Sequence, residues 1–181
     1  MLPGPGEVLH FSEDPSIRRF VPHVAATAED RRPLVWAVDA RRAPDYWFPR
    51  ACPRVLAWRR PSTRAEDAVR VLGPGGGERV HAVEYAWLDR MRTARVHAYR
   101  LPAAPFRPVD GTPEPYAMVS TETVEPLGSP EPVGDLLALH EQAGIQLRVL
   151  PVLWTFWDAV TTTTMGFSGI RLRNARPRRD S

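Results

Sequence analysis

The chain contains no lysine: all 24 of its basic residues are arginine. Schiff-base chemistry and a phosphate-binding loop of the Walker type both require a lysine, so the sequence excludes both. The arginine excess comes with 20 prolines and abundant alanine, a combination that is typical of a GC-rich bacterial genome. We therefore give the arginine excess little functional weight.

Cysteine is nearly absent, since Cys52 is the single one. One thiol excludes a disulfide framework. The amino terminus lacks the basic, apolar and small-residue regions of a secretory signal, and no apolar run reaches 18 residues. We therefore expect a cytoplasmic protein with no membrane span.

The excess of positive charge is small, at a formal +3, and it does not predict a nucleic-acid partner. The basic residues gather at the end of the chain, in Arg171, Arg173, Arg176, Arg178 and Arg179. A polyanion-binding arm is the alternative to a solvated, frayed terminus, which we favour. We predict a single globular domain over residues 1–174 and a flexible basic tail over 175–181.

What is present is a series of short strands with helices between them. Apolar and β-branched runs predict strands at residues 8–11, 33–39, 52–58, 78–87, 94–102, 115–124 and 144–151. We expect one or two helical turns after Asp39, a helix over 62–72 with Ser62 as N-cap, a helix from Ser129 to Gly144, and a buried helix over 152–160. In the helix over 62–72, one face carries Ala65, Ala68, Val69 and Leu72. This order predicts an α+β fold.

His10 stands at the end of the first strand, with Ser12 two residues later. Because side chains alternate along a strand, both project from the same face. Such a pair suits hydrogen bonding to a diol or an amide of a ligand. The alternative is that Ser12 caps a turn and that His10 is a half-buried histidine bonded within the protein. The residues alone leave both interpretations open.

The succession "LHFS", then "VWAVD", then a tyrosine resembles the beginning of ADP-ribosyltransferase-like folds. Those folds begin with a strand ending in His-Gly-Ser or His-Gly-Thr, then a strand of the type Ile-Tyr-Phe-Ala-Asp, then a short helix carrying a tyrosine. "VSTETVEPL", at 119–127, is similar to a late strand of rifamycin ADP-ribosyltransferases. The chain also resembles bacterial proteins of unknown function that begin His-Phe-Ser-Glu-Asp-Pro.

The resemblance implies a split, mostly antiparallel sheet and the transfer of ADP-ribose from NAD to a small-molecule or macromolecular acceptor. It gives catalytic roles to His10, Tyr46 and Glu122, and NAD-binding roles to Ser12, Phe11 and Trp36. The histidine and the hydroxyl would hold the ribose and amide on the nicotinamide side. The ring that stacks on the nicotinamide would be Tyr46 or, as in some rifamycin-modifying members, Trp36.

The sequence departs from the family pattern at two points, the first being that no glutamate stands in a Glu-x-Glu or Glu-Tyr-x-Val context. The second is that Phe11 replaces the glycine whose bare backbone lets the nicotinamide amide approach. This second departure favours an alternative function, namely that the chain is a relative that binds a ligand or a partner without turnover. In either case a small-molecule ligand is the expected partner, and the sequence carries no signal for an oligomeric state.

Two carboxylates compete for the role of the acid in such a site. Glu84 has small apolar neighbours on its strand face, so we expect it to be buried, where an unpaired carboxylate is costly. We predict that it pairs with Arg92 or Arg95, with a chemical role as the alternative. Glu122 lies in the segment that resembles the late strand, and we prefer it as the catalytic acid. Glu125 is expected to be solvated in a turn.

The candidate ligands for a metal site are His81, Glu84 and His97. His81 and Glu84 are three residues apart on a predicted strand and therefore face opposite sides of it. We expect no metal site from these residues.

Overall fold

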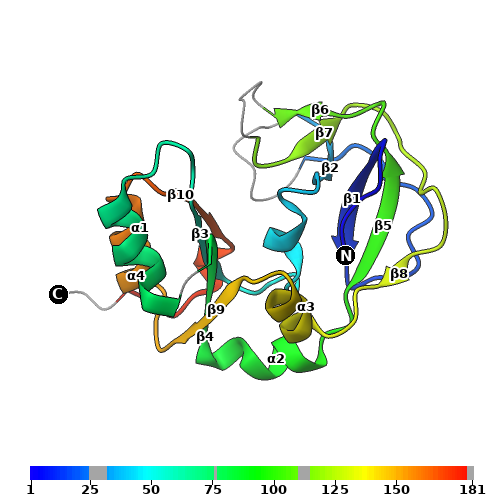
Figure 1. Cartoon of the computed structure of the whole chain (residues 1–181). Helices are drawn as coiled ribbons and strands as arrows, with labels where there is room; N and C mark the ends of the chain where they lie inside the picture. The colour runs from blue at the N-terminus through cyan, green and yellow to red at the C-terminus, as the bar shows by residue number, and fades with distance from the viewer. Residues whose placement is uncertain (25–31, 76, 110–114, 179–181) are drawn as a thin grey trace. The chain divides into compact units, whose positions relative to one another are not determined.

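The computed structural model describes residues 1–24, 32–75, 77–109 and 115–178 (Figure 1). The chain divides into two compact units, each built from two separate stretches of sequence. Unit 1 comprises Met1–Trp47 and Arg95–Gly134, and unit 2 comprises Phe48–Ala94 and Asp135–Ser181. That both units belong to one folding domain stays a prediction.

Unit 1 is built around two small antiparallel sheets. The first has the order β1-β5-β8, formed by Glu7–Ser12, His97–Pro102 and Glu131–Pro132. The second has the order β2-β7-β6, formed by Val35–Ala37, Met118–Ser120 and Arg107–Pro108. Leu9 and Val38 bond to each other in both directions, at 2.9 and 2.8 Å, and so join β1 to the segment after β2. A 3-10 turn, η1, follows at Ala43–Tyr46, with Pro44 in its first turn.

The side chains of β1 alternate between two apolar clusters because the strand is covered on both faces. On one face, Val8 packs in a cluster with Phe20 and Tyr99. On the other face, Leu9 packs with Val38 and Ala43, and the partly buried Phe11 and Tyr46 join them. The guanidinium of Arg100 then ties the three strands of this sheet together, at 2.6 Å from a carboxylate oxygen of Glu7 and 2.6 Å from one of Glu131.

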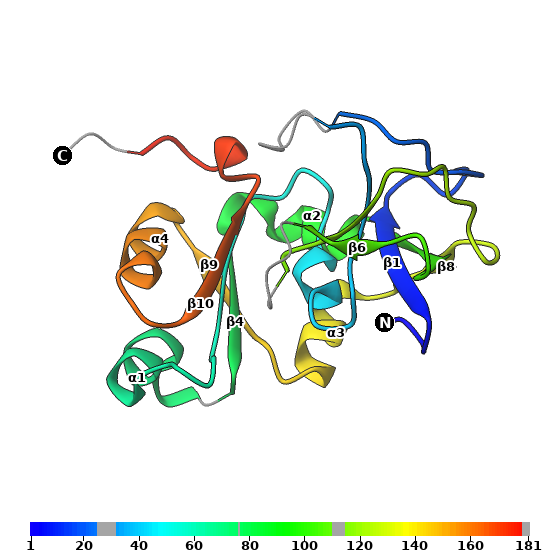
Figure 2. The ribbon, with the colours of Figure 1, turned by 90° about the horizontal axis from the view of Figure 1, so that it is seen from above.

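Unit 2 is a four-stranded sheet with helices on both of its faces (Figures 1 and 2). Its strand order is β10-β3-β4-β9, formed by Gly166–Ile170, Arg54–Trp58, Arg79–Glu84 and Gln146–Leu150. The pairs are antiparallel except for β4 and β9, which run parallel. Helices α1, Ala65–Leu72, and α4, Trp154–Thr161, pack on β3 and β4 through Val55, Ala57, Ala68, Val80 and Val160.

The remaining helical elements of unit 2 are short. The two helices are α2 (Leu88–Thr93) and α3 (Leu136–Gln142). The 3-10 turns are η2 (Gly73–Gly75), η3 (Tyr85–Trp87) and η5 (Leu172–Asn174). Together with the antiparallel-rich sheets, these elements confirm the predicted α+β class. None of the helices in the described ranges is long and apolar enough to cross a membrane.

Two helices differ from the sequence prediction at their first turns. α3 begins at Leu136 and not after Ser129, because Glu131–Pro132 pair with β5 as a strand and Asp135 then caps the helix. Its end is as predicted, since Gly144, with φ of +63°, follows the last turn. α1 begins at Ala65 without a side-chain cap, so Ser62 is not its N-cap.

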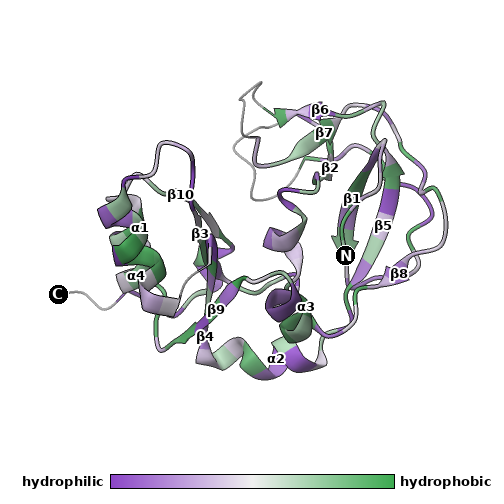
Figure 3. Ribbon diagram, in the orientation of Figure 1, coloured by the Kyte–Doolittle hydropathy of each residue, from purple (hydrophilic) through white to green (hydrophobic). Residues whose placement is uncertain are grey.

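The apolar face of α1 also differs from the prediction. Its buried residues are Ala68, Val71 and Leu72, while Val69 is 70% exposed. The prediction placed Ala65 and Val69 on the buried face and was wrong for both, since both are exposed, whereas Ala68 and Leu72 are buried as predicted. Figure 3 shows both hydrophilic and hydrophobic residues on this helix, as expected for one packed on one side only.

Ordered contacts continue beyond residue 174, where the prediction placed the start of a flexible tail. The indole Nε1 of Trp154 donates to the carbonyl of Arg176 at 2.6 Å. The guanidinium of Arg178 bonds both carboxylate oxygens of Asp158, at 2.8 and 3.0 Å. Unit 2 therefore extends at least to Arg178, and residues 179–181 of the predicted tail lie outside the described residues.

Candidate functional site

His10 is fixed by the backbone of the neighbouring strand. Its Nδ1 lies 2.8 Å from the carbonyl oxygen of Trp36. A carbonyl only accepts, so Nδ1 carries the hydrogen, and in a neutral ring Nε2 then carries the lone pair. The ring also packs against Phe20, with the ring centres 4.6 Å apart. The structure thus brings together the two motifs on which the resemblance depends.

Ser12 shares the strand face of His10 and caps a turn. Its side chain is buried, and its Oγ accepts the backbone N–H of Asp14 at 3.1 Å. This is the turn contact that the alternative interpretation anticipated. Since Oγ acts here as an acceptor, its own hydrogen remains a donor. The face therefore carries one acceptor, at His10 Nε2, and one donor, at Ser12.

The aromatic residues of the predicted site divide between two apolar clusters. Phe11 and Tyr46 pack against the cluster of Leu9, on the face of β1 opposite to His10. The ring of Trp36 stacks against that of Tyr116, with centres 6.3 Å apart. Tyr46 therefore packs against the same cluster as Phe11, and His10 bonds the backbone carbonyl of Trp36.

Glu122 does not lie on a strand. β7 ends at Ser120, and Glu122 follows it as an exposed residue whose N–H donates to Ser120 Oγ at 3.0 Å. The predicted strand over 115–124 was therefore too long at both ends. Glu125 is exposed as well, in agreement with its predicted solvation. Glu122 remains beside β7, but in contact with water.

Glu84 is buried as predicted, but its partners are backbone amides. The side chain is in unit 2 and is 1% exposed. Its carboxylate accepts the N–H of Leu153 at 3.2 Å and the N–H of Arg176 at 3.1 and 3.0 Å. Leu153 is the N-cap residue of α4, where the helix dipole favours a negative charge. Glu84 thus anchors a helix and the C-terminal segment.

The predicted arginine partners of Glu84 are therefore wrong. Arg92 forms its ion pair with Asp89, at 3.7 Å, and Arg95 belongs to unit 1. Within the described ranges, the groups bonded to the Glu84 carboxylate are the two amides alone. The hydrogen-bond partners of the Glu84 carboxylate are backbone N–H groups because the end of β4 lies in contact with the first turn of α4.

A buried histidine pair in unit 2 was not predicted. His81 Nδ1, on β4, lies 3.0 Å from His140 Nε2, on α3, and His140 Nδ1 lies 2.6 Å from the carbonyl oxygen of Leu136. The Leu136 carbonyl can only accept, so it fixes the direction of both hydrogen bonds. Nδ1 of His140 donates to Leu136, and Nδ1 of His81 donates to Nε2 of His140. The ring of Phe48 packs against both imidazoles. Each histidine stood in an apolar stretch of sequence, which was a signal of burial but not of pairing.

Both imidazoles of this pair are held neutral. Burial lowers the pKa of His81 well below its ordinary value, and its electrostatic interaction with the titrating His140 and with the positive charges of Arg79 and Arg54 lowers it further. Burial also lowers the pKa of His140, although its hydrogen bond to Leu136 opposes the shift. The pair is fully buried, so it is a structural element of unit 2 and not a ligand site.

Neither a thiol nor a metal site is available in the described residues. Burial raises the pKa of Cys52 to about 12, although the positive charge of Arg54 opposes the shift. A thiol in this state is a poor nucleophile. No three His, Cys, Asp or Glu side chains lie close enough to hold a metal ion in the part of the chain that the structure describes.

The comparisons with known proteins identify a family and no function. The chain belongs to a family of unknown function, DUF6886, whose model matches residues 9–175. Neither the curated proteins nor the solved structures contain a match to this chain. The match spans residues of both units.

Proposed function

We propose that this member of the family binds NAD in unit 1 and transfers its ADP-ribose to an acceptor. The observation that carries the proposal is the contact between His10 and the carbonyl of Trp36, at 2.8 Å. It joins the "LHFS" and "VWAVD" motifs, whose succession resembles the ADP-ribosyltransferase-like folds. The paired backbone bonds between Leu9 and Val38 support the same adjacency.

The polar groups on the His10 face of β1 fit the nicotinamide half of NAD. In a neutral imidazole, Nε2 of His10 is an acceptor, which is the kind of group that a ribose hydroxyl donates to. Ser12 offers its hydroxyl hydrogen to a carboxamide oxygen, which needs a donor. The Trp36 carbonyl sets the orientation of the imidazole and so prepares the acceptor before the ligand arrives.

The proposed reaction breaks the bond between the nicotinamide nitrogen and C1′ of the ribose. Nicotinamide leaves with the bonding electron pair, positive charge develops on the ribose, and a nucleophile of the acceptor forms the new bond to C1′. A carboxylate near the ribose lowers the barrier by stabilising this charge. Glu122 is the proposed acid, because it follows β7, which pairs with β2 next to Trp36.

Binding without turnover is the second candidate, and two observations favour it. Phe11 occupies the glycine position of the family pattern and packs with the cluster of Leu9. Glu122 is exposed, and an exposed carboxylate stabilises a developing charge less than a buried one does. In this case His10 and Ser12 hold a ligand and no bond is broken.

The test measures binding and turnover separately. The purified chain is incubated with NAD, released nicotinamide is quantified by chromatography, and NAD binding is measured by calorimetry. Transfer predicts nicotinamide release, and Glu122→Gln should reduce its rate by about 10²-fold or more. Glu125→Gln, a change of an exposed acid three residues away, is the matched control and should keep the rate.

The possible results separate the two candidates. Binding of NAD without release supports the second candidate and overturns the first. If His10→Gln leaves binding unchanged, His10 is not part of the site. The absence of both binding and release would contradict the first candidate and would exclude NAD as the ligand of the second.

A further inference from the structure

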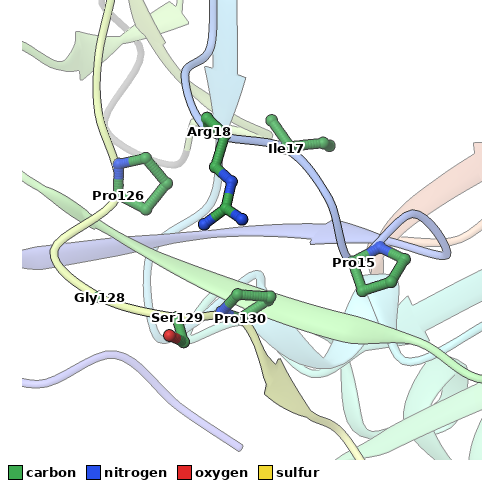
Figure 4. Close-up of a pocket in the computed structure, with 7 residues that line it drawn as sticks. All are labelled: Pro15, Ile17, Arg18, Pro126, Gly128, Ser129 and Pro130. Atoms are coloured by element: carbon green, nitrogen blue, oxygen red, sulfur yellow. The ribbon is translucent and has the colours of Figure 1, made fainter.

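Unit 1 has a surface depression of about 320 Å³ that no predicted site residue lines. Two segments form it, residues 15–18 after β1 and residues 126–130 before β8 (Figure 4). Phe20 and Val124 bond to each other in both directions, at 2.8 and 2.9 Å, and hold the two segments side by side. Prolines contribute three walls, at positions 15, 126 and 130, which restrict the backbone on both sides.

Hydrogen-bond donors gather at this depression. Figure 4 shows the guanidinium of Arg18 among the other lining residues. Within the described ranges, no carboxylate pairs with Arg18, and no group accepts the backbone N–H of Gly128 or of Ser129. The hydroxyl of Ser129 is a further donor. The space above the Gly128 backbone is open, since no atom lies within 4 Å of the place that a Cβ would take.

Two of the carboxylates next to these segments are bonded to other groups of the protein, and no carboxylate is among the residues that line the depression. Asp14 accepts the N–H and the hydroxyl of Ser16, at 2.8 and 2.6 Å. Glu131 binds the guanidinium of Arg100 at 2.6 Å. Neither carboxylate lines the depression. The depression therefore presents a positive charge and several donors, which is the complement of an oxyanion.

We propose that this depression binds a phosphate group, either free or carried by a small molecule. The planar guanidinium of Arg18 offers two parallel N–H groups, which match two oxygens of a phosphate. The amides of Gly128 and Ser129 and the Ser129 hydroxyl complete the shell from the facing segment. The proposal is independent of NAD binding at His10, because neither His10 nor Ser12 lines the depression.

The experiment is a titration followed by amide NMR on the full chain. Inorganic phosphate, phenyl phosphate and acetate are added separately at constant ionic strength, which controls for general screening. Phosphate should shift the amide signals of Gly128 and Ser129. Arg18→Gln should weaken this binding by roughly tenfold or more, because a hydrogen bond to a charged group is lost. Arg19→Gln, the adjacent exposed arginine that does not line the depression, is the matched control and should leave binding unchanged.

Each outcome decides the proposal. Tighter binding of phenyl phosphate than of inorganic phosphate supports a phosphorylated small molecule that also contacts the proline walls, and equal binding supports free phosphate. The proposal is overturned if neither phosphate shifts these amides, if acetate binds as tightly, or if Arg18→Gln and Arg19→Gln weaken binding equally. Arg18 is exposed, so its substitution should not disturb folding, which the retained spectrum of Arg18→Gln verifies.

Discussion

His81 and His140 form a hydrogen-bonded pair inside unit 2, with 3.0 Å between Nδ1 of the first and Nε2 of the second. The pair is 59 residues apart in sequence and joins strand β4 to helix α3. Each partner is neutral because burial opposes its protonation. The stability of the fold should therefore depend on pH in a defined range.

The first prediction is a loss of stability as the pH falls below about 6.5, the value at which an unfolded histidine takes up a proton. Both folded pKa values are lowered, so the unfolded chain binds more protons in this range, and the free energy of unfolding decreases with falling pH. Each histidine contributes up to about 1.4 kcal/mol per pH unit. Urea unfolding between pH 7.5 and 5 measures the slope.

The control for this prediction is an exposed histidine. His23→Gln should keep the slope, whereas replacing both His81 and His140 by leucine should flatten it. A free energy of unfolding that is constant between pH 7.5 and 5 in the unaltered chain would show that the pair does not govern acid stability.

The second prediction concerns Glu84 and the C-terminal segment. Glu84→Gln replaces one carboxylate oxygen by an NH₂ group, which cannot accept the Arg176 N–H. We expect the free energy of unfolding to fall by roughly 1–3 kcal/mol. Hydrogen exchange should become faster at Arg176 and Leu153. Glu78→Gln, on an exposed acid paired with Arg59, should change stability by less than about 0.5 kcal/mol. Unchanged exchange at Arg176 would contradict the anchoring role.

The third prediction tests whether helix α3 begins after Asp135, as in the structure, or after Ser129, as the sequence predicted. Asp135 caps this helix, with its carboxylate oxygen 2.8 Å from the N–H of Leu137 and 3.2 Å from that of Ala138. Asp135→Ala should therefore cost about 1 kcal/mol of stability. Ser129→Ala, at the start expected from sequence, should be nearly neutral. A larger loss for Ser129→Ala than for Asp135→Ala in thermal unfolding would reverse the assignment.

The fourth prediction is that Cys52 does not react in the folded chain. With a pKa of about 12 and a buried side chain, almost no thiolate exists at pH 8. A thiol reagent followed by absorbance should react at least about a hundredfold more slowly than with the chain in denaturant. Rapid reaction of the native protein would show that this part of unit 2 opens.

The strands were predictable because their pattern is local. Apolar residues at β1, β3, β4 and β9 defined them, and Gly144 marked the end of α3. The burial of Glu84 also followed from its strand neighbours. β10 was not predicted, because "GFSGI" has two glycines and only two large apolar residues. The start of α3 was misplaced because β8, which precedes it, forms only by pairing with the distant β5.

The sequence by itself determined the strands and helices that carry a local apolar pattern, and that Glu84 and the apolar strand faces are buried. Only the tertiary structure decided which groups meet. Glu84 meets an amide 92 residues away, and His81 meets His140 across β4 and α3. Likewise, Tyr46 and His10 lie on opposite faces of β1, although both belong to the predicted site. Periodicity determines the face from which a side chain projects, but the partner on that face depends on how distant elements pack.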